Sequence, residues 1–303
     1  HGKIYASKKL ITTELGHPDQ GLKILVTFIK EFTCEQGSGI EDIQAIGLAV
    51  PGPVCLKKEL MLTPPNMPLW VNVPIAQFLR DELGLPVFMN NDANAQALGE
   101  WKFGNFGNIN SLVYLTMSTG MGAGIIIDGE IICGVTDTAG EVGHFVLDPL
   151  GPKCPCGNNG CFEVYCGGKN VAIYLQSILE KFPDSLILKY AHGDINKVDM
   201  RCLLKAAKNN DPLALRCWNT YIEKLAQGIG ILIQTLNPDV IVLGTIAVYN
   251  QEQVMEPLKK ALPKYCWKMP LERCHIHPST LGSNISKLGT ISLAIDGIAR
   301  QKG

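Results

Sequence analysis

Residues 141–163 read EVGHFVLDPLGPKCPCGNNGCFE, a stretch that supplies one histidine and three closely spaced cysteines. His144, Cys154, Cys156 and Cys161 match the Cys₃His set that binds structural zinc, and four protein ligands leave no open position for an activated water. The intervening glycines let the backbone fold around one point. Unliganded loop cysteines are the alternative, but thiols this close together would be prone to oxidation. We therefore expect a structural zinc loop.

Carboxylates flank this loop on both sides. Glu141 lies shortly before His144, and Glu163 follows soon after Cys161. Carboxylates form strong, charge-assisted hydrogen bonds with hydroxyl groups, and a zinc-bound histidine commonly uses its second ring nitrogen for another partner. Taken singly, each glutamate could be a solvated surface residue. Their positions at the two ends of one loop favour a sugar-binding site.

A second candidate centre lies at Asp92. Residues 86–89 form a short apolar run typical of a strand, and Asn90, Asn91 and Asp92 follow it directly before a helix-forming run at 93–101. Ligands bind at the carboxyl ends of strands in open α/β sheets, and a carboxylate at a helix N-terminus stays ionised and can accept a hydroxyl proton. Asp92 could instead only cap the helix. The two neighbouring amides, which capping does not need, favour a polyol site with Asp92 as its base.

A glycine-rich segment, STGMGAG at residues 118–124, follows a predicted strand at 112–117 and leads into another at 124–128. Glycines let main-chain N–H groups approach phosphate oxygens, and the Thr119 hydroxyl adds a donor. The segment has neither the lysine of a P-loop nor the spacing of a Rossmann fingerprint, so a plain β-turn is an equal alternative.

The remaining periodicity indicates an α/β organisation. We predict strands at 43–50, 131–133 and 240–243 and a helix at 73–83, each bounded by proline, glycine or asparagine. Apolar residues spaced three and four apart predict a long helix that begins after Asp211 and ends before Asn237.

The composition limits the functional classes. Hydrophobic residues make up 46% and charged residues 18%, as in folded proteins, and 303 residues suit two α/β-sized domains with a cleft between them. A net charge of -1 without a Lys/Arg block provides no footprint for nucleic acid or an anionic membrane. No apolar run reaches bilayer-spanning length, and no signal segment opens the sequence. We expect a cytoplasmic protein that acts on small molecules, with no nucleic-acid or membrane partner.

Together these motifs resemble the ROK family of sugar kinases, related proteins and repressors. The resemblance covers nearly the whole chain and is carried by EVGH at 141–144, the cysteine loop followed by Glu163, NDAN at 91–94 and the loop around Gly52. It implies a two-domain α/β fold of the actin/hexokinase type, with ribonuclease H-like domains closing on a central cleft. Residues 1–105 would form a small N-terminal domain, 106–287 a larger domain with the zinc loop, and 288–303 a helix that returns to the small domain.

The resemblance also implies roles for single residues. Asp92 would be the catalytic base, with ATP and Mg²⁺ as cofactors beside the structural Zn²⁺. Thr119 and Gly120 would face the ATP phosphates, and Gly244 would lie near the adenosine. The residues implied as sugar contacts are Gly52, Asn66, Asn91, Asp92, Glu141, His144 and Glu163.

A glucokinase-like activity, from glucose to glucose 6-phosphate, is the function that the resemblance favours, with a homodimer as the expected assembly. N-acetylmannosamine, N-acetylglucosamine and fructose stay open as substrates, and the family also includes non-catalytic sugar-binding regulators. Pro53 offers no charge next to Gly52 to bind an N-acetyl group, which favours glucose.

The chain departs from the family pattern in three places. The family begins with a strand and an Asp/Gly/Gly/Thr phosphate loop, whereas this chain begins His1-Gly2-Lys3-Ile4, which matches the family's second strand. Either the chain is a fragment that lacks the first strand or the protein has lost a phosphate grip, and the fragment is the favoured interpretation. We expect this chain to bind hexose measurably, to bind ATP poorly and to turn over slowly. Thr245 follows Gly244 where a second glycine is usual, and Gly167 stands where a serine is expected.

Overall fold

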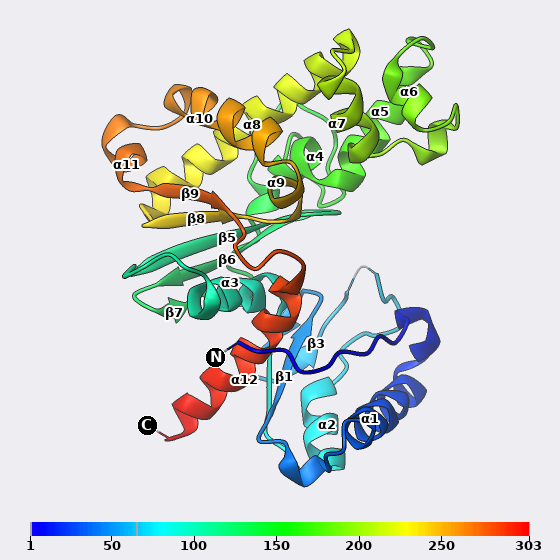
Figure 1. The fold of residues 1–303 in the computed structure, drawn as a ribbon, viewed down its shortest axis with the longest axis vertical. Helices are drawn as coiled ribbons and strands as arrows, with labels where there is room; N and C mark the ends of the chain where they lie inside the picture. The colour runs from blue at the N-terminus through cyan, green and yellow to red at the C-terminus, as the bar shows by residue number, and fades with distance from the viewer. Residues whose placement is uncertain (1, 65, 303) are drawn as a thin grey trace.

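The computed structural model describes residues 2–64 and 66–302. Three sheets organise these residues: a small parallel pair and a short antiparallel pair in the N-terminal part, and a mixed five-stranded sheet in the C-terminal part (Figure 1). Helix α12 (Ile285–Lys302) leaves the larger part and packs along the smaller one, against β1 (Ile46–Val50) and β4 (Val87–Asn91). Within the described ranges, no helix is both long and apolar enough to cross a bilayer.

The N-terminal part is built around the parallel pair β1 and β4, aligned from Ile46 opposite Val87 to Val50 opposite Asn91. β1 ends at Val50, as the following Pro51 and Gly52 predict, because proline lacks the N–H that a strand needs. The other elements of this part are η1 (Thr12–Leu15), α1 (Pro18–Glu35), η2 (Ile40–Asp42), β2 (Val54–Cys55), β3 (Leu60–Met61) and α2 (Ile75–Leu83).

The larger sheet has the strand order β7-β6-β5-β8-β9. Its strands are β5 (Ser111–Met117), β6 (Met121–Ile127), β7 (Glu130–Ile131), β8 (Val240–Leu243) and β9 (His275–Pro278). β5 pairs antiparallel with β6 and parallel with β8, so this central strand is buried on both faces. Its alternate residues enter two different cores: Val113 and Leu115 face the helical layer, whereas Leu112 and Tyr114 face α3 (Asp92–Phe103).

The helical layer covers the face of the sheet opposite α3 (Figure 1). Its longest member, α8 (Pro212–Leu236), begins after Asp211, whose side chain accepts from the Ala214 N–H at 2.8 Å, and ends at Asn237 in the left-handed conformation. The predicted cap and stop of this helix are therefore confirmed. The other elements of this layer are η3 (Val142–His144), α4 (Phe162–Cys166), α5 (Gly168–Leu179), α6 (Leu186–Tyr190), η4 (Ile195–Lys197), α7 (Met200–Lys208), α9 (Thr245–Tyr249), α10 (Gln251–Ala261), η5 (Leu262–Lys264) and α11 (Lys268–Arg273). η6 (Gly282–Asn284) follows β9 outside this layer and contacts α12.

The glycine-rich segment after β5 differs from the prediction. β6 begins at Met121, three residues earlier than expected, so the loop shrinks to Ser118, Thr119 and Gly120. Helix α3 explains Gly124 inside the strand, because a Cβ there would clash with the Ala93 carbonyl and the Ala97 side chain. The glycine therefore permits a close approach of helix to sheet.

The N-terminal segment also differs from the prediction. Residues 2–11 form no strand, so the expected match of Lys3-Ile4 to a second strand is wrong. The side-chain contacts of this segment go to helices instead of to a sheet edge: Lys8 pairs with Glu35 of α1 at 2.6 Å, and Ser7 accepts from Lys287 of α12 at 3.3 Å.

Candidate functional site

The end of β4 and the start of α3 place Asp92 at a turn from strand to helix. Asn91 caps the helix, because its side chain accepts from the Asn94 N–H at 2.7 Å, so capping does not require the Asp92 carboxylate. Asp92 keeps an open path to solvent. The surrounding protein nevertheless removes part of its hydration, and this burial raises the pKa of its carboxyl above the ordinary aspartate value. Asp92 is thus an exposed carboxylate at the end of a strand, with a pKa above that of an ordinary aspartate.

Two further carboxylates lie near Asp92. Burial raises the pKa of Glu141, and the negative charges of Glu163 and Asp92 raise it further, whereas His144 opposes them. Glu163 is positioned by the main chain, since it accepts from the Met121 N–H at 2.9 Å. The structure therefore brings together three acidic residues that the sequence separates by up to 71 positions. Such a group can accept several hydrogen bonds from the hydroxyls of one polyol.

Gly52 lies beside this group, on the loop that follows β1. A Cβ built on Gly52 would be 4.0 Å from the nearer carboxylate oxygen of Glu141 and would meet no closer atom. The main chain of Gly52 therefore faces Glu141 across a small open space. The peptide bond between Gly52 and Pro53 is cis.

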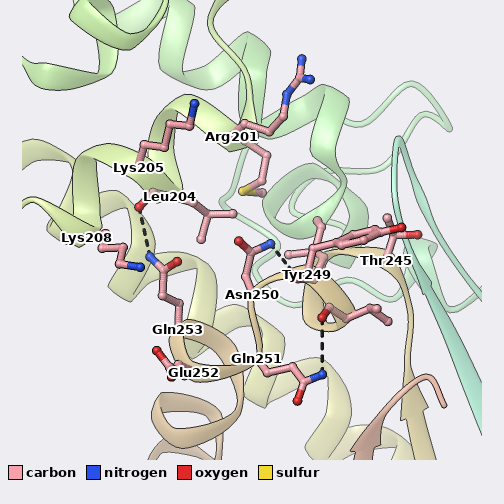
Figure 2. A pocket seen from close by; sticks show the side chains of 13 residues that line it. Arg201, Leu204, Lys205, Lys208, Thr245, Tyr249, Asn250, Gln251, Glu252 and Gln253 are labelled. Carbon is pink, nitrogen blue, oxygen red and sulfur yellow. Dashed lines mark hydrogen bonds between the residues drawn. The ribbon is translucent and has the colours of Figure 1, made fainter. Parts of the chain in front are cut away.

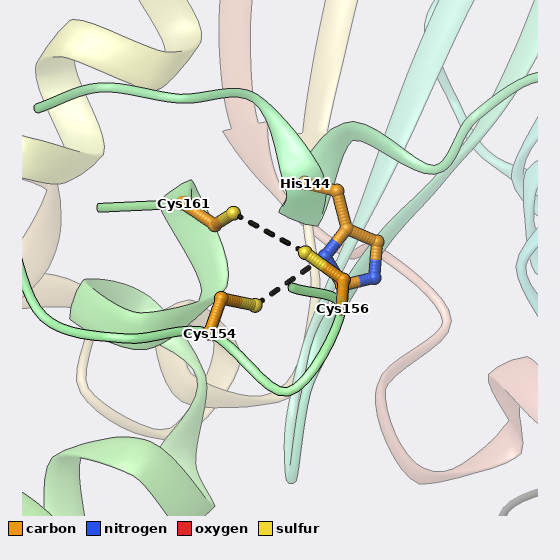
Figure 3. A group of neighbouring side chains, drawn as sticks. All are labelled: His144, Cys154, Cys156 and Cys161. Atoms are coloured by element: carbon orange, nitrogen blue, oxygen red, sulfur yellow. Dashed lines mark hydrogen bonds between the residues drawn. The ribbon is translucent and has the colours of Figure 1, made fainter. Parts of the chain in front are cut away.

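The predicted zinc ligands converge. Figure 3 shows the side chains of His144, Cys154, Cys156 and Cys161 turned toward one another, and their ligand atoms all lie within 4.8 Å of each other. Cys154 Sγ is 3.7 Å from His144 Nδ1, and Cys156 Sγ is 3.6 Å from Cys161 Sγ. Zinc–sulfur bonds of ~2.3 Å at tetrahedral angles place neighbouring ligand atoms about 3.8 Å apart. The four residues therefore fit a zinc ion, and His144 would bind it through Nδ1.

The short turn between β5 and β6 is fixed from two sides. The Gly168 and Lys169 N–H groups at the start of α5 donate to the Ser118 and Thr119 carbonyls at 2.9 and 3.0 Å. On the other side, a Cβ on Gly120 would lie only 2.6 Å from the Glu163 carboxylate. Thr119 and Gly120 are thus held next to the acidic group. Their predicted contacts with the ATP phosphates would have to be made from this position.

A separate pocket of about 700 Å³ adjoins the end of β8, next to Gly244. Figure 2 shows its side chains coming from α7 on one side and from α9 and the start of α10 on the other. Arg201, Lys205 and Lys208 give the α7 side a positive charge, and the Tyr249 ring, 69% exposed, lies across from it. This pocket was not predicted beyond Gly244 itself, because its residues carry no motif.

Two asparagines of the sequence motifs, Asn66 and Asn94, lie in different surroundings. Asn66 is exposed in the loop between β3 and α2, and no described contact joins it to the acidic group, so its role stays a prediction. Asn94, by contrast, is buried in the first turn of α3 and donates to Asn90 at 2.9 Å, while its own amide oxygen has no hydrogen-bond partner among the described residues. Its place in the NDAN motif was the only sequence signal for it.

These features define a class of protein: an actin/hexokinase-like α/β fold with a Cys/His cluster able to hold zinc and an acidic group at a strand end. The chain belongs to the ROK family, because the sequence model of the ROK family matches residues 2–297.

Known relatives are similar over most of the chain. A glucokinase from Thermotoga maritima is 30% identical over 275 residues, which cover 91% of this chain and 86% of the glucokinase. A putative xylose repressor from Caldicellulosiruptor is also 30% identical, over 84% of this chain, but the match spans only 63% of the repressor. Among solved structures, a ROK family glucokinase from Streptomyces griseus in complex with glucose and AMPPNP superimposes with a TM-score of 0.80 at 26% identity, covering 98% of this chain and 93% of the glucokinase.

Proposed function

We propose that this protein is a sugar kinase that transfers the γ-phosphoryl group of MgATP to a hexose, with glucose as the substrate and O6 as the acceptor. The observation that carries the proposal is the convergence of Asp92, Glu141 and Glu163 beside the Gly52 loop. Glucokinases at about 30% identity, and the solved glucokinase bound to glucose and AMPPNP, support the same assignment.

In this proposal Asp92 is the general base. Its raised pKa makes it a stronger base than an ordinary aspartate, so it can accept the proton of the attacking hydroxyl. Glu141, Glu163 and the free Nε2 of His144 hold the sugar hydroxyls, and the main chain of Gly52 closes the site from the other part of the fold. Orienting the acceptor hydroxyl in this way is a large part of the catalysis of phosphoryl transfer.

ATP would lie on the far side of Asp92. The turn at Thr119 and Gly120 offers main-chain groups to the phosphates, and the pocket beside Gly244 has the size and the cationic side chains to hold the nucleoside. Mg²⁺ would bridge the phosphates and offset the charge of the nearby carboxylates. Zinc, when bound to His144 and the three cysteines, would fix the loop that carries Glu163.

A sugar-responsive regulator without kinase activity is the second candidate, favoured by the similarity to a putative xylose repressor. One experiment separates the two. Purified protein is incubated with MgATP and, in parallel, with glucose, xylose, fructose, N-acetylglucosamine and N-acetylmannosamine, and ADP release and sugar binding are both measured. Glucose-dependent ADP release supports the kinase, whereas sugar binding without ADP release from any sugar supports the regulator.

A further inference from the structure

The two parts of the fold are connected through helices. We call residues 2–91 the first lobe and residues 111–281 the second lobe. Helix α3 lies between them, packs on β5 and β6 of the second lobe, and is crossed by α12, which also packs on β1 of the first lobe. Ser279 and Thr280, at the end of the second lobe, donate to the buried Glu100 of α3. Helices α3 and α12 therefore connect the two lobes on this side of the molecule.

On the side of the acidic group, a hydrogen bond joins the lobes. The Leu56 N–H of the first lobe donates to the Asp137 carboxylate of the second lobe at 2.8 Å. A second contact joins the lobes close by, because the side chain of Asn90 in the first lobe hydrogen-bonds with the Cys133 thiol of the second. Among the hydrogen bonds and ion pairs of residues 2–64 and 66–302, the bond from Leu56 to Asp137 is the direct interlobe connection that has a charged acceptor. A hydrogen bond to a charged acceptor is stronger than a neutral one, so this contact resists separation of the two lobes.

Both ends of this bond are fixed within their own lobes. Leu56 follows β2, and the Leu56 carbonyl accepts from the Glu59 N–H in the tight connection to β3. Asp137 lies in a loop that is closed by the Ala139 N–H donating to the Cys133 carbonyl at 2.9 Å. Because neither end can follow the other, opening of the lobes would break the bond.

Asp137 has a backbone conformation that favours glycine. Its φ is +59°, in the left-handed region, where a side chain is disfavoured, although aspartate tolerates the region better than most residues. Glycine would satisfy the backbone here without strain. The aspartate therefore adds an interaction that the turn itself does not need.

The bond also lies next to the proposed sugar site. Leu56 follows Gly52 by four residues, and Asp137 precedes Glu141 by four. Gly52 and Glu141 face each other across the lobes, with 4.0 Å between the position of a Gly52 Cβ and the Glu141 carboxylate. The bond therefore fixes the distance between the two walls that would enclose a hexose.

We propose that Asp137 is an interlobe latch, a positioning residue whose carboxylate holds the Leu56 N–H and keeps the lobes closed over the hexose. The effect on hexose binding rests on the proposed function, whereas the effect on lobe closure does not. Asp137 touches no reacting atom in this scheme; it acts through the positions of Gly52 and Glu141.

Three variants test the latch. Asp137→Gly removes the carboxylate and suits the backbone, so the protein folds. Asp137→Asn keeps an oxygen acceptor at the same place. Asp128→Gly is the matched control, because Asp128 is also an aspartate at positive φ, in the exposed turn between β6 and β7, and its side chain makes no described hydrogen bond. We expect glucose affinity, measured by calorimetry, to fall about 10-fold in Asp137→Gly and to stay within about 3-fold of the unmodified protein in the other two.

Small-angle X-ray scattering without sugar gives a readout that does not depend on the function. If Asp137 holds the lobes closed, Asp137→Gly should have a larger radius of gyration than the unmodified protein, Asp137→Asn and Asp128→Gly. Scattering curves of Asp137→Gly that superimpose on those of the unmodified protein would overturn the latch. If Asp137→Gly has the larger radius of gyration but the unmodified protein binds no sugar, the latch is supported and the proposed function is rejected.

Discussion

Glu163, on the helix that follows the cysteine loop, accepts a hydrogen bond from the main-chain N–H of Met121, the first residue of β6, at 2.9 Å. The same carboxylate fills the space next to Gly120, where a Cβ would come within 2.6 Å of it. The cysteine loop, a proposed sugar contact and the proposed phosphate turn are therefore joined into one unit. A substitution that displaces any one of the three should therefore displace the other two.

Gly120→Ala tests this connection. The added methyl group would push the Glu163 carboxylate out of its place, so we expect glucose binding to weaken by about 10-fold or more, as for the loss of one charge-assisted hydrogen bond. Gly122→Ala is the matched control, because a Cβ there meets only the Thr116 hydroxyl at an ordinary 3.8 Å. Calorimetric titration of both variants makes the comparison, and equal glucose affinities in the two would refute the link between Gly120 and Glu163.

Zinc should be bound at one ion per chain by His144 and the three cysteines. Elemental analysis checks the content, and Cys156→Ser should lower the melting temperature and the glucose affinity together, since Glu163 is anchored by the same loop. Cys34→Ser provides the control, because Cys34 is an exposed cysteine of α1 outside the cluster. A protein free of zinc that keeps its melting temperature after chelation would contradict the zinc site.

Asp92→Asn should nearly abolish turnover while glucose still binds. The amide keeps the shape of the side chain but cannot accept the proton, so kcat should fall by about 10²–10⁴-fold. Asn91 caps α3, so the substitution leaves the start of the helix intact. Steady-state kinetics with calorimetry measure the two effects separately. A variant with kcat close to that of the unmodified protein would remove Asp92 from the role of base.

The same substitution should stabilise the folded protein at neutral pH. Burial raises the pKa of Asp92 in the folded state, so the fold disfavours the charged form. The unfolded chain binds fewer protons than the folded one between the two pKa values, and the resulting loss of stability is complete above the folded pKa. Asp92→Asn should therefore raise the melting temperature at pH 7, and the gain should vanish below the ordinary aspartate pKa. A gain that persisted unchanged at acid pH would point to another cause.

Tyr249→Ala tests the nucleotide side of the site. Its exposed ring lies in the pocket beside Gly244, so its loss should weaken binding of an ATP analogue by roughly 5- to 100-fold, the range for one lost stacking partner. Glucose affinity should not change. Trp267→Ala removes another aromatic ring, 76% exposed, outside the residues that line the pocket, and should change neither affinity. Loss of glucose affinity in Tyr249→Ala would show that the two subsites are not separate.

Sequence reasoning succeeded where chemistry is local. The spacing of Cys154, Cys156 and Cys161 predicted the Cys/His cluster that the structure forms, because ligand residues so close in the sequence come together without contacts from distant segments. That this cluster binds zinc stays a prediction. The cap of α8 at Asp211 followed from side-chain chemistry at a single position in the same way. The family and its fold followed from the motifs around these residues.

Sequence reasoning failed where packing between segments that are distant in the sequence determines the structure. Nothing near Gly124 in the sequence shows that α3 packs against it, so the strand was predicted to begin at Gly124 and residues 121–123 were interpreted as part of a loop. The bond from Leu56 to Asp137 joins residues 81 positions apart and has no local signal at either end. The pocket beside Gly244 is formed by α7 and α9, which meet only in the folded chain. The domain limits at 105 and 287 stay predictions.

Phosphorylation of glucose by MgATP, followed by ³¹P NMR, is the most direct test of whether the protein is a sugar kinase. A kinase with Asp92 as its base should give a new phosphomonoester signal that matches glucose 6-phosphate, grows with time and protein concentration, and is lost in Asp92→Asn. Glucose that binds to the protein, with MgATP present and no phosphomonoester formed, would contradict the kinase and leave the carboxylates at Asp92, Glu141 and Glu163 as a sugar-sensing site.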